Sequence, residues 1–219
     1  MKANERGTER GVAVESDDLL KRGLLVEYAS LAWMTAEAVG AIIAGTFAGS
    51  LALLAFGGDS LIELASSIAV VGHLREENSG RGSDDRTEKA EQATVLLLFL
   101  LIPVIGLGTT YAYLSGVKPE LSILGILVAA GAIVIMPVLW FEKRRIGKKA
   151  NCLPMAVDAT ESATCFSMSV ALLVGLVANF LWKLWWVDYV ATVVILFFLS
   201  REAWESFRHF RAERQRSMF

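Results

Sequence analysis

Cysteine, histidine and proline are scarce in this sequence, which contains two cysteines, two histidines and four prolines in 219 residues. Because Cys152 and Cys165 lie near or within one expected helix, they are not expected to form a structural disulfide. The chain has no glycine-rich loop of the kind that cradles phosphate, and its net charge of −2 argues against a nucleic-acid partner. No signal peptide is expected, since the sequence up to Arg22 is polar and charged.

Apolar sequence, in contrast, is abundant, and 54% of the residues are hydrophobic. A helix crosses the ~30 Å hydrocarbon core of a bilayer with roughly 20 mostly apolar residues. Six segments meet this requirement: 24–44, 51–74, 93–114, 121–140, 155–180 and 184–199. The sequence therefore predicts an all-α, polytopic membrane protein with six transmembrane helices.

The basic residues are divided unevenly between the connections of these segments. Of the 21 lysines and arginines, 19 lie in the N-terminal segment, the second and fourth connections and the C-terminal tail. Only Lys118 and Lys183 lie in connections on the other side. Since short cytoplasmic segments carry the excess of Lys and Arg, both termini are expected in the cytoplasm and the protein in the cytoplasmic membrane.

Three parts are expected along the chain. They are a polar cytoplasmic segment (1–22), a six-helix transmembrane domain (23–201) and a short amphipathic cytoplasmic tail (202–219). The tail is too short for a folded domain, and the spacing of Trp204, Phe207 and Phe210 is typical of a helix at the membrane interface. The polar, Gly- and Ser-rich stretch 75–89 is predicted to be a flexible loop.

Acidic residues inside the predicted spans are candidate functional residues, because each one is costly in a bilayer. The third and fourth spans have no acid in their cores. The candidates are Glu37 in the first span, Asp59 and Glu63 in the second, Asp158 and Glu161 with Cys165 in the fifth, and Asp188 at the start of the sixth. For Asp188, near the outer boundary, a capping or interfacial role is also expected.

Spacing places these groups on shared helix faces. Asp59 and Glu63 are at positions i and i+4, and Asp158, Glu161 and Cys165 are at i, i+3 and i+7. Two ionised carboxylates this close repel each other, so either one holds a proton or a cation lies between them. Carboxylates with one thiolate suit a divalent metal of the Zn²⁺, Co²⁺, Cd²⁺ or Fe²⁺ type. The alternative is that the acids form hydrogen bonds between helices or a proton path without metal.

Two stretches resemble a known family. "AGSLALLAFGGDSLIELASSIAVV" is similar to the second helix of cation diffusion facilitator (cation efflux) transporters, with Asp59 and Glu63 on the metal-ligand positions. "AVDATESATCFSMSVALLVGL" is similar to the fifth helix, where Asp158, Glu161 and Cys165 match the family's pattern. The likeness extends over about residues 23–207.

The resemblance implies a transporter rather than an enzyme, with no resident cofactor. It implies a homodimer that exchanges a divalent metal, with Zn²⁺ favoured over Co²⁺, Cd²⁺, Fe²⁺ and Mn²⁺, for protons by alternating access. Asp59, Glu63, Asp158, Glu161 and Cys165 are its expected metal-binding residues, and Glu37 and Asp188 are expected to carry protons or support the ligands.

The sequence also departs from the family's pattern. Usual zinc-transporting members supply histidine on these helices, whereas His73 and His209 fall at the cytoplasmic edges of the spans. Cys165 stands where an acid is usual, and the cytoplasmic domain that follows the sixth helix in relatives is expected to be absent.

Two other functions are compatible with the fold. A non-transporting membrane scaffold has no need of acids on two facing helices. A transporter of an organic cation needs an aromatic cage, but the residues around Asp59 and Glu161 are aliphatic and small. Metal efflux is therefore the predicted function.

Overall fold

The computed structural model describes residues 2–78, 84–150 and 152–216. These residues form six helices: α1 (Lys2–Ala48), α2 (Leu51–Asn78), α3 (Asp84–Leu114), α4 (Ile123–Ala150), α5 (Leu153–Trp182) and α6 (Val187–Arg216). No strand occurs in the described part of the chain. The all-α fold predicted from the sequence is therefore confirmed.

Five of the described helices are long and apolar enough to cross a membrane, over residues 21–48, 51–72, 92–114, 123–150 and 155–182. The helix α6 is not among them. Its apolar stretch ends at Leu199, and the charged residues Arg201 and Glu202 follow after Ser200. Length and apolar composition alone thus support five of the six predicted spans, and α6 enters the bundle through its contacts with other helices.

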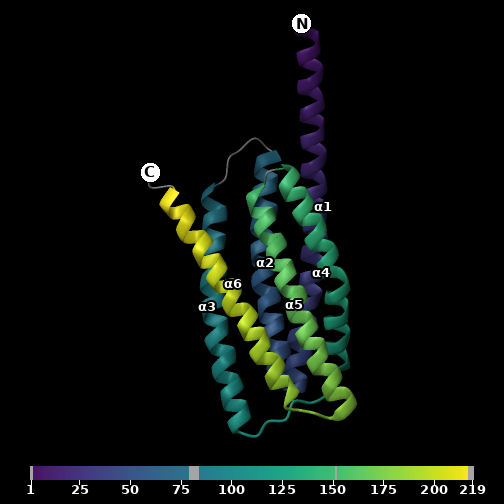
Figure 1. The fold of residues 1–219 in the computed structure, drawn as a ribbon, viewed down its shortest axis with the longest axis vertical. Coiled ribbons are helices and arrows are strands. Elements are labelled where there is room, and N and C mark those ends of the chain that lie inside the picture. The colour runs from purple at the N-terminus through teal and green to yellow at the C-terminus, as the bar shows by residue number, and fades with distance from the viewer. Residues whose placement is uncertain (1, 79–83, 151, 217–219) are drawn as a thin grey trace.

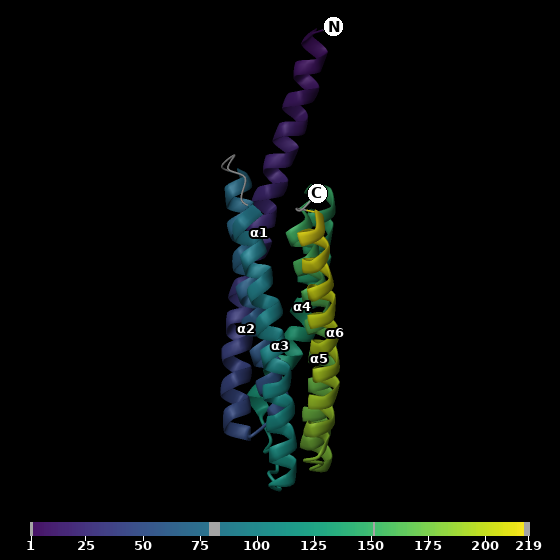
Figure 2. The same ribbon diagram turned by 90° about the vertical axis from the view of Figure 1, so that its left-hand side faces the viewer.

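Helix α1 packs on α2 and α4, and α5 packs on α4 and α2. Helix α3 packs on α2 and α6, and α6 also packs on α2 and α5. The first turns of α1 extend beyond the bundle, and both chain ends lie at the same end of the molecule (Figures 1 and 2). The α3–α4 and α5–α6 connections, which contain Lys118 and Lys183, lie at the opposite end (Figure 1). This arrangement agrees with the charge-based topology.

Two adjacent glycines fix α2 between its neighbours just before Asp59. A Cβ on Gly57 would lie 2.9 Å from Ile42 Cγ1 of α1, and a Cβ on Gly58 would lie 2.9 Å from Leu101 Cδ1 of α3. Both distances are shorter than van der Waals contact. Beside Gly57 the backbone of α1 is also close (Ile42 N, 3.1 Å), whereas beside Gly58 the flexible end of the Leu101 side chain would have to move. The glycines thus let α2 pack closely against α1 and α3 just before Asp59.

The start of α2 is capped from another helix. The backbone N–H of Leu53 donates a hydrogen bond to Ser50 Oγ (3.1 Å), and Ser50 Oγ donates to Asp188 Oδ1 of α6 (2.5 Å). Ser50 thereby satisfies one of the free N–H groups at the helix start. Asp188 supports this cap, which is close to the role expected for it from the sequence.

Helices extend further into the polar segments than the sequence predicts. The segment 75–89, predicted to be a loop, is helical up to Asn78 and again from Asp84, and residues 79–83 lie outside the described residues. The segment 2–22 is continuous with α1. In the tail, where a helix was predicted, α6 continues to Arg216. Once a span is helical, each further residue adds a hydrogen bond without a new nucleation step. The side chains of His73, His209 and Phe210 lie outside the described residues.

The charge-based topology is tested by single cysteines in a variant whose two native cysteines are replaced. Lys118→Cys and Arg145→Cys put thiols on exposed positions in the α3–α4 connection and near the end of α4. A membrane-impermeant maleimide is expected to label Arg145→Cys only from the cytoplasmic side and Lys118→Cys only from outside. Labelling of both from the same side would contradict the predicted topology.

Candidate metal centre

The interior of the bundle is rich in carboxylates. Among the described side chains, eight acidic ones are buried, against a single buried lysine, Lys143. The eight acids are Glu27, Glu37, Asp59, Glu63, Asp158, Glu161, Asp188 and Glu202. Since a buried charge is costly unless it is paired, the partners of each acid indicate its role.

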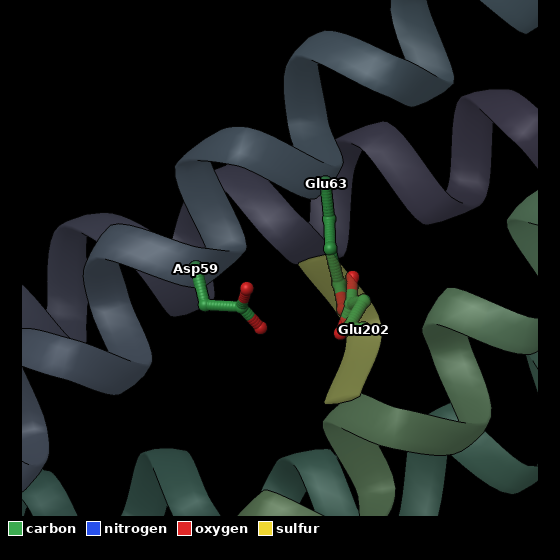
Figure 3. A group of neighbouring side chains, drawn as sticks. All are labelled: Asp59, Glu63 and Glu202. Atoms are coloured by element: carbon green, nitrogen blue, oxygen red, sulfur yellow. The ribbon is translucent and has the colours of Figure 1, made fainter. Parts of the chain in front are cut away.

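Three of these acids form a cluster, Asp59 and Glu63 of α2 and Glu202 of α6, whose side chains point toward one another (Figure 3). One oxygen atom from each residue lies within 4.8 Å of the others. All three residues are at least nine-tenths buried. Both oxygens of Asp59 and Glu63, and Oε2 of Glu202, have no hydrogen-bond partner.

This geometry fits a hard divalent cation. Oxygens on opposite sides of such an ion lie about 4–5 Å apart, twice a metal–oxygen distance of about 2.0–2.6 Å. Asp59 and Glu63 accept no hydrogen bond at either oxygen, so no donor compensates the charge of these two carboxylates. The cluster can therefore be neutralised by a bound cation or by protons.

Glu161 of α5 lies beside this cluster without being part of it. Its Oε1 accepts a long hydrogen bond from Ser66 (3.4 Å), and its Oε2 has no partner. Glu161 and Glu202 both line a cavity of about 360 Å³ between α5 and α6. The remaining lining residues are Val157, Thr160, Thr164, Glu205, Ser206 and Arg208. The cavity is thus in contact with the cluster through Glu202.

Glu37 of α1, in contrast, is satisfied by hydrogen-bond donors. Trp33 Nε1 donates to Glu37 Oε2 (2.6 Å), while Ser60 Oγ (2.7 Å) and Cys165 Sγ (3.3 Å) donate to Oε1. Cys165, expected from the sequence as a ligand, is therefore a buried thiol that donates to Glu37 in this structure. Glu37 joins α1, α2 and α5 next to the cluster.

Asp158 also lies outside the cluster. Its Oδ2 forms an ion pair with Lys143 Nζ of α4, and its Oδ1 accepts a hydrogen bond from Ser67 Oγ of α2 (2.9 Å). The structure thus brings together Asp59 and Glu63, with Glu161 nearby, from the predicted metal-binding residues. It places Asp158 and Cys165 in other hydrogen-bonded groups.

Two residues of these groups were missed by sequence reasoning. Glu202 was assigned to the cytoplasmic tail, although 14 residues of helix after Asp188 span only about 21 Å, less than the bilayer core. Lys143 was counted with the basic run at the end of the fourth span. It lies, however, on the buried face of α4 with Met136, Leu139 and Ile146. In both cases helical spacing and length, read from the sequence, could have indicated that the residue is buried within the bundle.

A family model described as the cation efflux transmembrane domain matches residues 90–210, more than half of the chain. The chain belongs to the cation efflux family. This cation efflux protein is also similar to the manganese efflux system protein MneS of Bacillus subtilis (strain 168). The two are 24% identical over 201 residues, which cover 89% of this chain and 69% of MneS. The family confirms the membrane transporter of metal cations that was predicted from the sequence.

The partners of Glu63 and Glu37 predict opposite effects of the same substitution on the metal-free cation efflux protein. Glu63→Gln removes a charge that no donor compensates, and the free energy of unfolding is expected to rise. In Glu37→Gln, an amide N–H₂ group replaces one carboxylate oxygen, and this donor then faces another hydrogen-bond donor, either Trp33 or Ser60. The free energy of unfolding of Glu37→Gln is expected to fall by about 1.5–3 kcal/mol, which is the contribution of a hydrogen bond to a charged group.

The measurement is thermal unfolding in detergent with a chelator present. Glu120→Gln, a change on the exposed surface at the other end of the bundle, serves as the control and is expected to have little effect. If Glu63→Gln destabilises the protein as much as Glu37→Gln, the carboxylate of Glu63 has a partner and the assignment is wrong.

Proposed function

We propose that this protein exports a divalent metal cation from the cytoplasm through a site formed by Asp59, Glu63 and Glu202. The observation that carries the proposal is the convergence of three buried carboxylates, of which Asp59 and Glu63 accept no hydrogen bond at either oxygen. Within membranes, such acids are costly and typical of ion pathways.

The cavity between α5 and α6 supports a route to this site. Its lining residues belong to the N-terminal half of α5 and the C-terminal half of α6, at the end of the molecule where both chain termini lie (Figure 1). Carboxylates and hydroxyls on this wall replace part of the hydration shell of an approaching cation. Glu161 is the first buried acid beside the cluster, so we assign it to the loading of the ion.

The donor set favours a harder ion than the sequence suggested. Three carboxylates offer only oxygen, which suits Mn²⁺ better than the softer metals. The preference for Zn²⁺ in Sequence analysis combined the family resemblance with a Cys165 thiolate ligand, and that thiol donates to Glu37. The similarity to a protein named for manganese efflux supports the same choice. We therefore propose Mn²⁺ as the transported ion, with Zn²⁺ as the alternative that the experiments below distinguish.

The carboxylate oxygens of the cluster can also account for the exchange of metal for protons. Carboxylates must be deprotonated to bind a metal, so metal binding releases protons. Protons and metal then compete for one cluster, and this competition couples their opposite movements. We include in the proposal the homodimer, the cytoplasmic membrane and the cytoplasmic termini that the sequence analysis predicts.

Transport is tested with inverted membrane vesicles loaded through the proposed cytoplasmic face. Asp59→Asn, Glu63→Gln and Glu202→Gln are each expected to lower Mn²⁺ uptake at least tenfold, because each removes a charged ligand worth about 1.4 kcal/mol or more. Uptake by the parent protein is expected to make the lumen more alkaline, because protons leave the lumen in exchange for the metal that enters it. The exposed Glu120→Gln serves as the control, with unchanged uptake expected.

Unchanged uptake in the Asp59, Glu63 and Glu202 variants would refute the site. A parent protein that moves none of Mn²⁺, Zn²⁺, Co²⁺, Cd²⁺ and Fe²⁺ would refute the transport function and favour a membrane scaffold.

Cys165→Ser tests the choice of metal. Because a serine hydroxyl can also donate to Glu37, the order of binding of Mn²⁺, Zn²⁺ and Cd²⁺ in competition assays is expected to stay the same. A thiolate ligand predicts instead that Cd²⁺ and Zn²⁺ weaken more than Mn²⁺. Weaker binding of Cd²⁺ and Zn²⁺ would show that Cys165 is a metal ligand, and it would favour Zn²⁺ as the transported ion.

A further inference from the structure

Lys143 is the one buried basic side chain among the described residues, and the proposed transport site does not include it. Its ammonium group and the side chains of Glu27 and Asp158 are at most 1% exposed. Lysine is almost never fully buried unless it is paired. The surroundings of this ammonium group therefore have to supply its hydrogen bonds and its counter-charge.

Three oxygens from two other helices do so. Lys143 Nζ donates to Ser30 Oγ of α1 (2.8 Å), lies 3.4 Å from Glu27 Oε2 of α1, and forms a close ion pair with Asp158 Oδ2 of α5. An ammonium group has three N–H donors, and three oxygens face it here. It donates hydrogen bonds to Ser30 and Asp158, and the Glu27 carboxylate, which accepts no hydrogen bond, adds a second negative charge 3.4 Å away. Oxygens therefore face the ammonium group as they would face a bound cation.

This oxygen-lined position adjoins the proposed transport site. Asp158 is one helical turn from Glu161 on α5, and Ser67, which donates to Asp158, is one turn from Glu63 on α2. Without the ammonium group, two buried carboxylates and two hydroxyls would remain within reach of the same metal ions. Such an oxygen set suits a hard divalent cation.

We propose that Lys143 is a tethered cation that permanently fills a second cation site, formed by Glu27, Ser30 and Asp158. By filling it, the lysine keeps Asp158 from capturing the metal that passes one turn away. The chain then holds one exchangeable divalent ion, and the second position neither binds nor retains metal.

The experiment counts bound metal. The purified full-length protein, Lys143→Met and Lys143→Met/Asp158→Asn are equilibrated with Mn²⁺ alone, and bound manganese is measured by mass spectrometry. One ion per chain is expected for the parent, two for Lys143→Met, and one again for the double variant, which lacks the Asp158 carboxylate. Lys148→Met, on the exposed side of α4, is the matched control and is expected to bind one.

The count separates this inference from the proposed function. If the cluster of Asp59, Glu63 and Glu202 binds no metal, the parent binds none, but Lys143→Met still gains one ion. If Lys143 has only a structural role, folded Lys143→Met binds the same number of ions as the parent. That equality would overturn the inference.

Loss of folding in Lys143→Met is covered by a second measurement. Lys143→Ala is combined with n-propylammonium, which reproduces the deleted methylenes and ammonium group. Propylammonium is expected to compete with the additional Mn²⁺ ion, and either cation is expected to raise the thermal midpoint of Lys143→Ala more than that of the parent. A variant that stays unfolded, or unchanged in midpoint, with both cations would contradict a cation site at this position.

Discussion

The negative charge of a carboxylate inside an apolar helix bundle has to be compensated, because burying it without a partner costs several kcal/mol. Hydrogen-bond donors, a positively charged side chain, or a cation or proton bound from outside the protein can compensate it. This constraint organises the interior of the cation efflux protein. Its buried acids far outnumber its one buried base in the described part of the chain. The way in which each acid is compensated separates the structural residues from those that can bind cargo.

Glu37 shows the first solution, since donors from α1, α2 and α5 surround its two oxygens. Asp158 shows the second, since Lys143 supplies a charge and Ser67 supplies a donor. Asp59 and Glu63 have neither. The first two solutions tie the helices together around the third. In the third, the charge of the carboxylate oxygens is left for a bound cation to compensate.

Much of this arrangement could be predicted from the sequence. Long apolar segments give the helices, and the start of α2 at Leu51 is the predicted one. The i, i+4 spacing put Asp59 and Glu63 on one face, as observed (Figure 3). These predictions succeed because they depend on local periodicity. Asp188 was also placed near a helix start, although the cap that it supports, through Ser50, is that of α2 rather than that of its own helix.

Contacts between helices could not be predicted in the same way. A composition window treats Glu202 and Lys143 as members of charged segments, because it does not register that neighbouring helices bury them. The spacing of Asp158 and Cys165 was correct, but their hydrogen bonds to Lys143 and Glu37 depend on how α5 is rotated against α1 and α4. Rotation follows from side-chain packing, for example at Gly57 and Gly58, which set how closely α1 and α3 approach α2.

The central claim is that α2 and α6 together supply the oxygen ligands of a divalent cation. Its most direct test is an anomalous diffraction measurement on crystals of the protein grown with Mn²⁺. A manganese peak bonded to Asp59, Glu63 and Glu202 is expected, with Cys165 still directed at Glu37. A peak bonded to Cys165 and Asp158, with Glu202 turned away, would contradict it.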